Sequence, residues 1–380
     1  TERILRKMKF DYLIVGAGYA GSVIAERIAE ELDKKVLIID RRGHIAGNAY
    51  DYFDENGVLV HKYGPHIFHT GSKKVWNYLS RFTDWKPYYH KPLAFVDGKK
   101  VPIPFNFNTM YELFPQKQAE RLEKLLIDKY GFGKKIPILK LIETKDPDLK
   151  FLADFIYQKV FYGYTLKQWG MKPEDLDFSV TSRVPVYLSR DNNYFQDQYQ
   201  AIPANGYTSM LKNIISRKNI HVMLQTDFND IRDAVKFDKL VYTGPIDAFF
   251  DYSHGRLPYR SLRFDLKSFK KESFQETSVV NYPNNHDYTR ITEYKKFIGQ
   301  EIPYTTVAYE YPEQYEEGKN EPYYPIPKKE NHEIFDKYRA EAEKLKNVIF
   351  AGRLAEYKYY DMDEITGVAL MIFKNKIAGK

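Results

Sequence analysis

The spacing of hydrophobic and polar residues changes several times along the chain, and each change predicts a different kind of element. Residues 10–15 (FDYLIV) are mostly apolar, residues 19–32 repeat apolar side chains at helical spacing, and residues 36–39 (VLII) are apolar again. Two later apolar runs, at 239–242 (KLVY) and 347–350 (NVIF), each lead into a glycine turn. The pattern predicts a parallel α/β sheet with strands from both ends of the chain, closed by an amphipathic helix from about residue 363.

The residues between these strands follow two other periods. Residues 109–169 repeat apolar positions at helical spacing, whereas runs between 250 and 312, such as SVVNYP and YTRITEYKKF, alternate as in an antiparallel sheet. The segment LAFVDGKKVPIPF (93–105) predicts a hairpin. We therefore expect an α/β fold with three units: a discontinuous Rossmann-like dinucleotide-binding domain (1–88, 205–247 and 345–380), a helical insertion domain (105–178), and an antiparallel β-sheet domain (89–104, 179–204 and 248–344).

Length and composition narrow the class of protein. With 380 residues the chain exceeds the usual size of a single core, and no apolar run approaches the roughly 20 residues needed to span a bilayer. The chain has no cysteine, which excludes disulfides, thiolate metal ligands and cysteine nucleophiles, and which fits a reducing compartment. The segment TERILRKMK lacks the apolar core of a secretory signal, so we expect a soluble, cytoplasmic protein with no membrane partner.

Charge and tyrosine content point to a small anionic ligand. The 58 basic and 51 acidic residues leave a net charge of +7 that is spread along the chain, so we expect no nucleic-acid partner. The content of 33 tyrosines is more unusual than this net charge. A tyrosine ring stacks and its hydroxyl donates a hydrogen bond, a combination that suits a nucleotide or a sugar.

The turn after the first predicted strand has the glycine spacing of a dinucleotide-binding site. Gly16 suits a tight turn, Gly18 lets the backbone approach a pyrophosphate, and Gly21 lets the helix pack against the strand. Asp40 closes the second strand, where its carboxylate can accept hydrogen bonds from a ribose. Strand, helix, second strand and acid together predict a dinucleotide site.

A second glycine-containing turn, RRGHIAGNAYD (41–51), follows directly and favours FAD over a nicotinamide cofactor. The arrangement is similar to that of glutathione-reductase-like flavoproteins, in which such a turn lies against the pyrophosphate and the flavin end. Arg41, Gly47 and Asn48 are therefore candidate FAD contacts. The alternative is a solvated loop whose glycines have no binding role.

Several motifs taken together resemble one family, the flavin-dependent UDP-galactopyranose mutases. The motifs run from about residue 12 to about residue 365 and are GAGYAG, HIAGNAYD, HKYGPHIFHT, GYTLKQWG, DNNYF, VYTGPID, DYTRITEYK, EPYYPI and GRLAEYKYYDMD. Three positions depart from the usual family pattern: Ala46 replaces a glycine, Asp287 a proline and Tyr294 a histidine. These departures bear on substrate detail and affinity rather than on reaction class.

The resemblance implies an isomerase that interconverts UDP-galactopyranose and UDP-galactofuranose by a redox-neutral ring contraction. In the family, N5 of reduced FAD is the nucleophile at the anomeric carbon, and a flavin-iminium sugar intermediate opens and recloses the ring. The resemblance also implies a homodimer, with NAD(P)H as the reductant of the flavin.

The same resemblance assigns residues to the substrate and to the cofactor. Arg183 and Arg290 match the family's two arginines at the leaving diphosphate, and His69 matches a histidine near the flavin. We expect the loop that carries Arg183 to close over the substrate. The implied substrate residues are Phe161, Tyr164, Trp169, Arg183, Tyr194, Arg290, Tyr324 and Tyr359, with Tyr164 stacking on uracil. The remaining implied cofactor residues are Gly64, His66, Gly352, Arg353, Asp361 and Met362.

Three other interpretations need comparison with this one. His61, His66 and His69 raise the question of a metal, but no acid or cysteine accompanies them at a fitting spacing, so we expect none. An amine-oxidase-like or nicotinamide-dependent flavin oxidoreductase would share the glycine turn, yet the arginine and tyrosine set suits a diphosphate better than an amine. A protein with the GDP-dissociation-inhibitor fold would bind prenylated GTPases without catalysis, and a bound flavin would exclude it.

Overall fold

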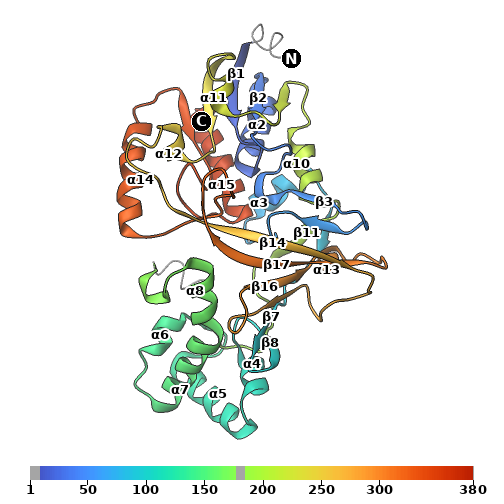
Figure 1. Ribbon diagram of the computed structural model, residues 1–380, viewed down its shortest axis with the longest axis vertical. Coiled ribbons are helices and arrows are strands. Elements are labelled where there is room, and N and C mark those ends of the chain that lie inside the picture. Colours follow the sequence, from blue (N-terminus) through green and yellow to red (C-terminus); the bar gives the residue numbers. More distant parts are fainter. Residues whose placement is uncertain (1–8, 177–184, 380) are drawn as a thin grey trace.

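The computed structural model describes residues 9–176 and 185–379, which extend along one long axis (Figure 1). An α/β unit lies at one end, a long twisted antiparallel sheet crosses the middle, and a group of helices lies at the opposite end. The first strand and the last helix both belong to the α/β unit, so the chain leaves this unit and returns to it.

Five parallel strands form the sheet of the α/β unit, in the order β12-β2-β1-β13-β19. Their bounds are Lys9–Val15 for β1, Val36–Ile39 for β2, Ile220–Met223 for β12, Lys236–Tyr242 for β13 and Val348–Phe350 for β19. β1 pairs with β2 on one side and with β13 on the other, and β19 extends the sheet beyond β13. The predicted discontinuous parallel sheet is confirmed, because the apolar runs at 239–242 and 347–350 both enter it.

Three helices pack together on one face of this sheet: α2 (Tyr19–Leu32), α10 (Tyr207–Ile215) and α15 (Met362–Ile372). Ile24 and Ile28 of α2 are fully buried beside Ile14 of β1 and Leu211 of α10. Each fully buried side chain of this size contributes about 2 kcal/mol through its loss of water contact. The helical spacing of these apolar residues therefore fixes the face that α2 turns to the sheet.

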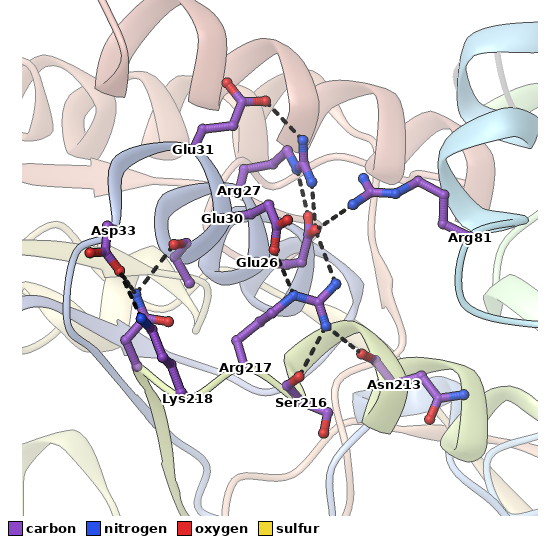
Figure 2. Close-up of polar contacts among 12 residues, drawn as sticks. Glu26, Arg27, Glu30, Glu31, Asp33, Arg81, Asn213, Ser216, Arg217 and Lys218 are labelled. Carbon is purple, nitrogen blue, oxygen red and sulfur yellow. Dashed lines mark hydrogen bonds and ion pairs between the residues drawn. The ribbon is translucent and has the colours of Figure 1, made fainter.

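A buried carboxylate ties the distal half of α2 to its neighbours (Figure 2). The Glu26 side chain is fully buried and accepts a hydrogen bond from the hydroxyl of Tyr78, on α3 (Lys73–Leu79), at 2.9 Å. Three guanidinium groups, those of Arg27, Arg81 and Arg217, surround the same carboxylate. The cluster joins α2, the segment after α3 and the segment after α10 through one negative charge.

The middle sheet has seven strands in the order β18-β14-β17-β16-β15-β7-β8. Their bounds are Leu93–Val96 for β7, Lys99–Pro102 for β8, Tyr259–Phe269 for β14, Val279–Asn281 for β15, Arg290–Glu293 for β16, Thr305–Gln314 for β17 and Tyr324–Pro325 for β18. All neighbours are antiparallel except β15 and β7, which are parallel. Both the predicted hairpin at 93–105 and the predicted antiparallel sheet within 250–312 are confirmed.

The helical unit contains α4 (Phe107–Leu113), α5 (Gln116–Tyr130), α6 (Ile138–Ile142), α7 (Pro147–Ile156) and α8 (Gly163–Trp169). Its apolar residues form a core of their own, which agrees with the helical period of residues 109–169. Between α7 and α8 the backbone forms a π-helical segment, Tyr157–Tyr162. Such segments are rare and often occur at functional sites, and this one carries Phe161.

The other strands and α-helices are short, except for α14. The strands are β3 (Asp51–Phe53), β4 (Leu59–His61), β5 (Phe68–Thr70), β6 (Trp85–Pro87), β9 (Lys135–Ile136), β10 (Val186–Tyr187) and β11 (Tyr199–Pro203). The helices are α11 (Phe228–Ile231), α12 (Ile246–Phe249), α13 (Lys295–Ile298) and α14 (Lys329–Ala342), with a 3-10 turn at Gly47–Ala49. Within the described ranges, none of the helices has both the length and the apolar character that crossing a bilayer requires.

Two segments lie elsewhere than the sequence pattern placed them. Residues 179–204 were expected in the antiparallel sheet domain, but β10 pairs with β9 of the helical unit, and β11 pairs with β5 and β6. Helix α14, expected in the same domain, packs against α12 beside the α/β unit. Strands of two to five residues carry too little pattern to select a partner, so tertiary packing decides where they pair.

Candidate active site

A single large cavity, about 920 Å³ in volume, lies where the three units meet. Its walls come from the glycine turn after β1, the turn after β2, the π-helical segment and α8, the strands β16 and β17, and the start of α15. The cavity is lined by every sequence-predicted site residue that the structure describes: Gly16, Gly18, Gly21, Asp40, Arg41, Gly47, Asn48, Gly64, His66, His69, Phe161, Tyr164, Trp169, Tyr194, Arg290, Tyr324, Gly352, Arg353, Tyr359, Asp361 and Met362. Arg183 and part of the loop expected to close over the substrate lie outside the described residues.

The glycine turn is shaped as a dinucleotide site requires. Gly16 has φ +108°, and a Cβ there would lie 2.0 Å from Oγ1 of Thr243. A Cβ on Gly21 would lie 2.0 Å from the carbonyl oxygen of Gly16, so α2 packs closely enough to aim its N-terminus at the cavity. The Asp40 carboxylate accepts hydrogen bonds from the backbone N–H groups of Ala17 and Arg42, both at 2.9 Å. These contacts hold the carboxylate at the cavity wall.

The turn after β2 lies against the glycine turn. A Cβ on Gly47 would lie 3.0 Å from the Cα of Gly18, so the two backbones meet without side chains between them. The Arg42 guanidinium donates to Oδ1 of Asn48 at 3.0 Å and pairs with Glu321 at 2.6 Å. Arg41, the arginine that the sequence singled out, is half exposed and pairs with the same glutamate. Arg42 is more buried than Arg41. Because the two arginines are adjacent in sequence, the sequence alone could not show which of them is the more buried.

An ion pair between a half-buried arginine and a buried glutamate forms another part of the cavity wall. Nε of Arg290 on β16 lies 2.8 Å from Oε2 of Glu310 on β17, and Glu310 is 1% exposed. Thr289 donates to the other carboxylate oxygen at 2.9 Å. Burial lowers the pKa of the Arg290 guanidinium, but the adjacent carboxylate of Glu310 outweighs it, so the net direction is upward. The pair holds a permanent cation at the cavity wall.

Aromatic side chains line the same cavity as this cation, and Tyr164 and Tyr324 are close enough to raise the pKa of Arg290. The rings of Tyr324 and Tyr359 stack with their centroids 5.7 Å apart, and the ring centroids of Trp169 and Tyr324 are 5.9 Å apart. The guanidinium of Arg353 lies 4.5 Å from the centroid of the Tyr359 ring. Burial raises the pKa of Tyr164 and of Tyr324, so both hydroxyls stay protonated and can donate hydrogen bonds. The arrangement offers cationic and neutral donors within one enclosed space.

The histidines divide into two environments. His66 keeps its Nδ1 2.8 Å from the Gly64 carbonyl oxygen, and burial lowers its pKa to about 4. Burial likewise lowers the pKa of His61 to about 3. His69 instead pairs its Nδ1 with Oδ2 of Asp197 at 2.8 Å. Among the described residues, no group of three or more His, Cys, Asp or Glu side chains is placed to hold a metal ion.

The start of α15 forms the last wall. The Asp361 backbone N–H donates to Oε2 of Glu364 at 2.9 Å, and Arg353 donates to the carbonyl oxygens of Tyr323 and Tyr360 at 3.1 and 2.7 Å. The guanidinium therefore joins the segment before β18 to the segment before α15. The helix N-terminus at Met362 adds partial positive charge on this side of the cavity.

Sequence reasoning missed three groups at or behind the cavity wall: Glu310, Arg42 and Asp197. Glu310 alternates in phase with the buried positions of β17, and an acid at such a position was a usable signal. No sequence signal marked Asp197, because it pairs with His69, which is 128 residues away in the chain.

Two family models match the chain. One, described as UDP-galactopyranose mutase, matches residues 159–359. The other, described as an NAD(P)-binding Rossmann-like domain, matches residues 14–82, which include the glycine turn and the turn after β2. The first match contains all eight predicted substrate residues, and the second contains the predicted dinucleotide turn.

Similar proteins cover the chain almost completely. A probable UDP-galactopyranose mutase of Klebsiella pneumoniae is 39% identical over 94% of this chain and 92% of its own. A dTDP-fucopyranose mutase of Escherichia coli is 36% identical over 92% of this chain and 94% of its own. A UDP-galactopyranose mutase of Mycoplasma genitalium is 36% identical over 93% of this chain and 92% of its own.

Solved structures share the fold at low sequence identity. A crystal structure of reduced UDP-galactopyranose mutase superposes with a TM-score of 0.74 at 15% identity, covering 98% of this chain and 96% of the other. A putrescine oxidase triple mutant reaches a TM-score of 0.61 at 8% identity, with coverage of 98% and 99%. The fold is therefore shared with a UDP-galactopyranose mutase and with a putrescine oxidase, so fold alone does not determine the chemistry.

Proposed function

This chain belongs to the UDP-galactopyranose mutase family, and we propose that it interconverts UDP-galactopyranose and UDP-galactofuranose with FAD as its cofactor. One observation carries the proposal: one cavity joins a dinucleotide-binding turn to a half-buried arginine and to several tyrosines that line the same wall. An amine oxidase has no use for a buried cation at its substrate end, whereas a diphosphate leaving group needs one.

The cofactor contacts follow from the geometry of the turns. FAD would be held by the glycine turn and Asp40 at its adenosine and pyrophosphate end, and by the residues near Gly64, Arg353 and Met362 toward its flavin end. When bound and reduced, FAD supplies N5 as the nucleophile for the anomeric carbon. We further propose that NAD(P)H reduces it, that the chain is active only with reduced FAD, and that the protein is a homodimer.

The chain's own residues stabilise the departing diphosphate. Arg290 is held in place by Glu310 and presents its remaining guanidinium N–H groups to the cavity. Tyr324 and Tyr359 add hydroxyl donors from the stacked pair beside it. Because these groups are half-buried in the cavity wall, their hydrogen bonds to developing negative charge are stronger than those of fully exposed groups. Arg183 remains a predicted second cation.

The nucleotide end of the substrate would lie on the π-helical segment. Phe161 and Tyr164 come from that segment and from the first turn of α8, and both line the cavity. We propose that the Tyr164 ring stacks on uracil and that Trp169, at the end of α8, covers the substrate. Phe161 and Tyr164 are three residues apart, across the junction of the π-helical segment and α8.

The decisive experiment uses the purified protein and two nucleotide sugars. We expect a flavin visible spectrum, and conversion of UDP-galactofuranose to UDP-galactopyranose only after reduction with dithionite, followed by chromatography. A dTDP-fucopyranose sample tests the activity named for the Escherichia coli relative. Flavin without isomerisation of either sugar nucleotide would favour an oxidoreductase, and a protein without flavin would favour a binding protein.

A further inference from the structure

His69 is held on two sides by groups that the predicted active site does not include. Its Nδ1 lies 2.8 Å from Oδ2 of Asp197, and its ring stacks on that of Phe195 with centroids 3.6 Å apart and planes at 16°. His69 and Phe195 line the cavity, whereas Asp197 does not. The carboxylate therefore contacts the ring nitrogen on the side away from the cavity.

The segment that carries both groups is itself fixed. Strands β5 and β11 are antiparallel, with Gln200 directly opposite His69. The Gln200 side-chain amide donates to the carbonyl oxygens of Phe195 at 3.2 Å and of Asp197 at 2.9 Å. These hydrogen bonds fix the turn before β11 relative to the strand that pairs with β5. The His69 ring therefore cannot rotate without losing its contacts with Asp197 and Phe195.

We propose that Asp197 is a positioning residue that holds His69 with Nδ1–H directed at the carboxylate and Nε2 directed at the cavity. A carboxylate on one ring nitrogen fixes the tautomer and stabilises the imidazolium that forms when the other nitrogen accepts a proton. The side-chain exposures are 17% for His69 and 37% for Asp197, so the imidazole is the more enclosed member. Neighbouring His90 is buried and its pKa is lowered to about 3, so it stays neutral and adds no competing charge.

His69 could carry protons during the ring contraction. This part of the inference rests on the proposed function. As the bond from the anomeric carbon to O5 breaks, O5 gains a proton. As O4 forms its bond to the same carbon, the 4-hydroxyl loses a proton. Nε2 first takes a proton from solvent, which forms the imidazolium that Asp197 stabilises. The imidazolium gives this Nε2 proton to O5 and takes the proton of the 4-hydroxyl in return, so His69 ends each conversion as the same imidazolium and no oxidant or reductant is consumed.

The test combines catalysis with a direct measurement of the tautomer. Asp197→Asn keeps the size of the side chain but removes its charge. We expect kcat to fall about 100-fold, the size of a lost acid–base contribution, with KM for the nucleotide sugar changed less than about twofold and the flavin spectrum retained. Asp233→Asn is the matched control, because the Asp233 side chain is 95% exposed; it should leave both constants unchanged.

Nitrogen-15 NMR of the histidine side chains tests the positioning without any turnover. The signal lost in His69→Gln identifies His69. We expect Nδ1 protonated and Nε2 bare in the unchanged protein, and the Nε2–H tautomer in Asp197→Asn. An Nε2–H tautomer in the unchanged protein, or a kcat of Asp197→Asn equal to that of Asp233→Asn, would overturn the proposal. If the unchanged protein converts no nucleotide sugar, the proposed function fails, while the tautomer still decides the positioning.

Discussion

Among single side chains, the half-buried arginine on β16 is the group on which the proposed chemistry depends most. Arg290 is placed by Glu310 at 2.8 Å, and Glu310 is in turn held by Thr289 at 2.9 Å. An arginine can pair with the carboxylate through Nε while the terminal nitrogens remain for a phosphate, and a lysine cannot do both. The planar fork, rather than charge alone, is what this position uses.

We therefore expect Arg290→Lys to lower kcat by about 100-fold while the flavin stays bound, because a preorganised donor to the leaving group is lost. Steady-state kinetics on the nucleotide sugar measures this. Arg263→Lys provides the control, since Arg263 lies on the exposed side of β14 and pairs with Glu313 at 3.0 Å. Equal activity of the two variants would remove Arg290 from the mechanism.

At the level of helices and strands, α2 connects the cavity, at its N-terminus, to an ion-pair cluster in its distal half. Its N-terminus faces the cavity after the glycine turn, and its distal half carries Glu26, whose carboxylate meets three guanidinium groups (Figure 2). Because the helix is rigid, contacts at Glu26 help to fix the direction in which the N-terminus points. The three arginines are 12–41% exposed, so water screens part of their mutual repulsion.

Glu26→Gln removes the negative charge and leaves these arginines close together in a partly buried site. We expect the melting temperature to fall by roughly 5 °C, since breaking a buried ion pair on one side is strongly destabilising. Differential scanning fluorimetry measures the change. Glu30→Gln is a suitable comparison because Glu30 pairs with Arg217 at 2.9 Å but is 47% exposed; a shift as large as that of Glu26→Gln would contradict the argument from burial.

Across the three units, one segment leaves the antiparallel sheet after β17, contacts the dinucleotide domain beside the cavity, and returns to the same sheet at β18. Residues 315–323, between β17 and β18, contribute Tyr315, Glu317, Pro322 and Tyr323 to the cavity wall. Glu317 contacts Tyr252 and Arg256, and Glu321 contacts Arg41 and Arg42. Burial raises the pKa of Glu321, and the two arginines lower it by more, so its carboxylate is charged at neutral pH.

If FAD occupies the cavity, these ion pairs oppose its release. We expect Glu321→Gln to increase the rate of FAD dissociation about fivefold, which corresponds to a loss of about 1 kcal/mol for partly exposed pairs, and we expect added salt to reduce the difference. Recovery of flavin fluorescence after dilution measures the rate. Glu276→Gln, which removes an exposed pair with Lys100, should have no effect. A rate unchanged in Glu321→Gln would show that FAD leaves by another route.

Many site residues could be predicted from the sequence, because they belong to contiguous motifs. The glycine turn and the acid at the end of β2 occupy fixed offsets within one strand–helix–strand unit, and local pattern is enough to predict such a unit. The aromatic residues of α8 were instead implied by the family resemblance of the motif GYTLKQWG. The strands at 239–242 and 347–350 were equally clear, since a strand buried on both faces must be continuously apolar. These features led to the discontinuous fold and to a residue set whose described members all line one cavity.

Tertiary structure alone decided which charged groups meet. Glu310 faces Arg290 because the register of β16 against β17 places those two residues opposite each other, and a shift of one residue would turn the glutamate to the other face. Asp197 reaches His69 because β11 pairs with β5, a choice that five and three residues of strand do not specify in sequence. Local pattern depends on neighbours along the chain, whereas such contacts depend on how whole elements pack, and only the folded chain contains that information.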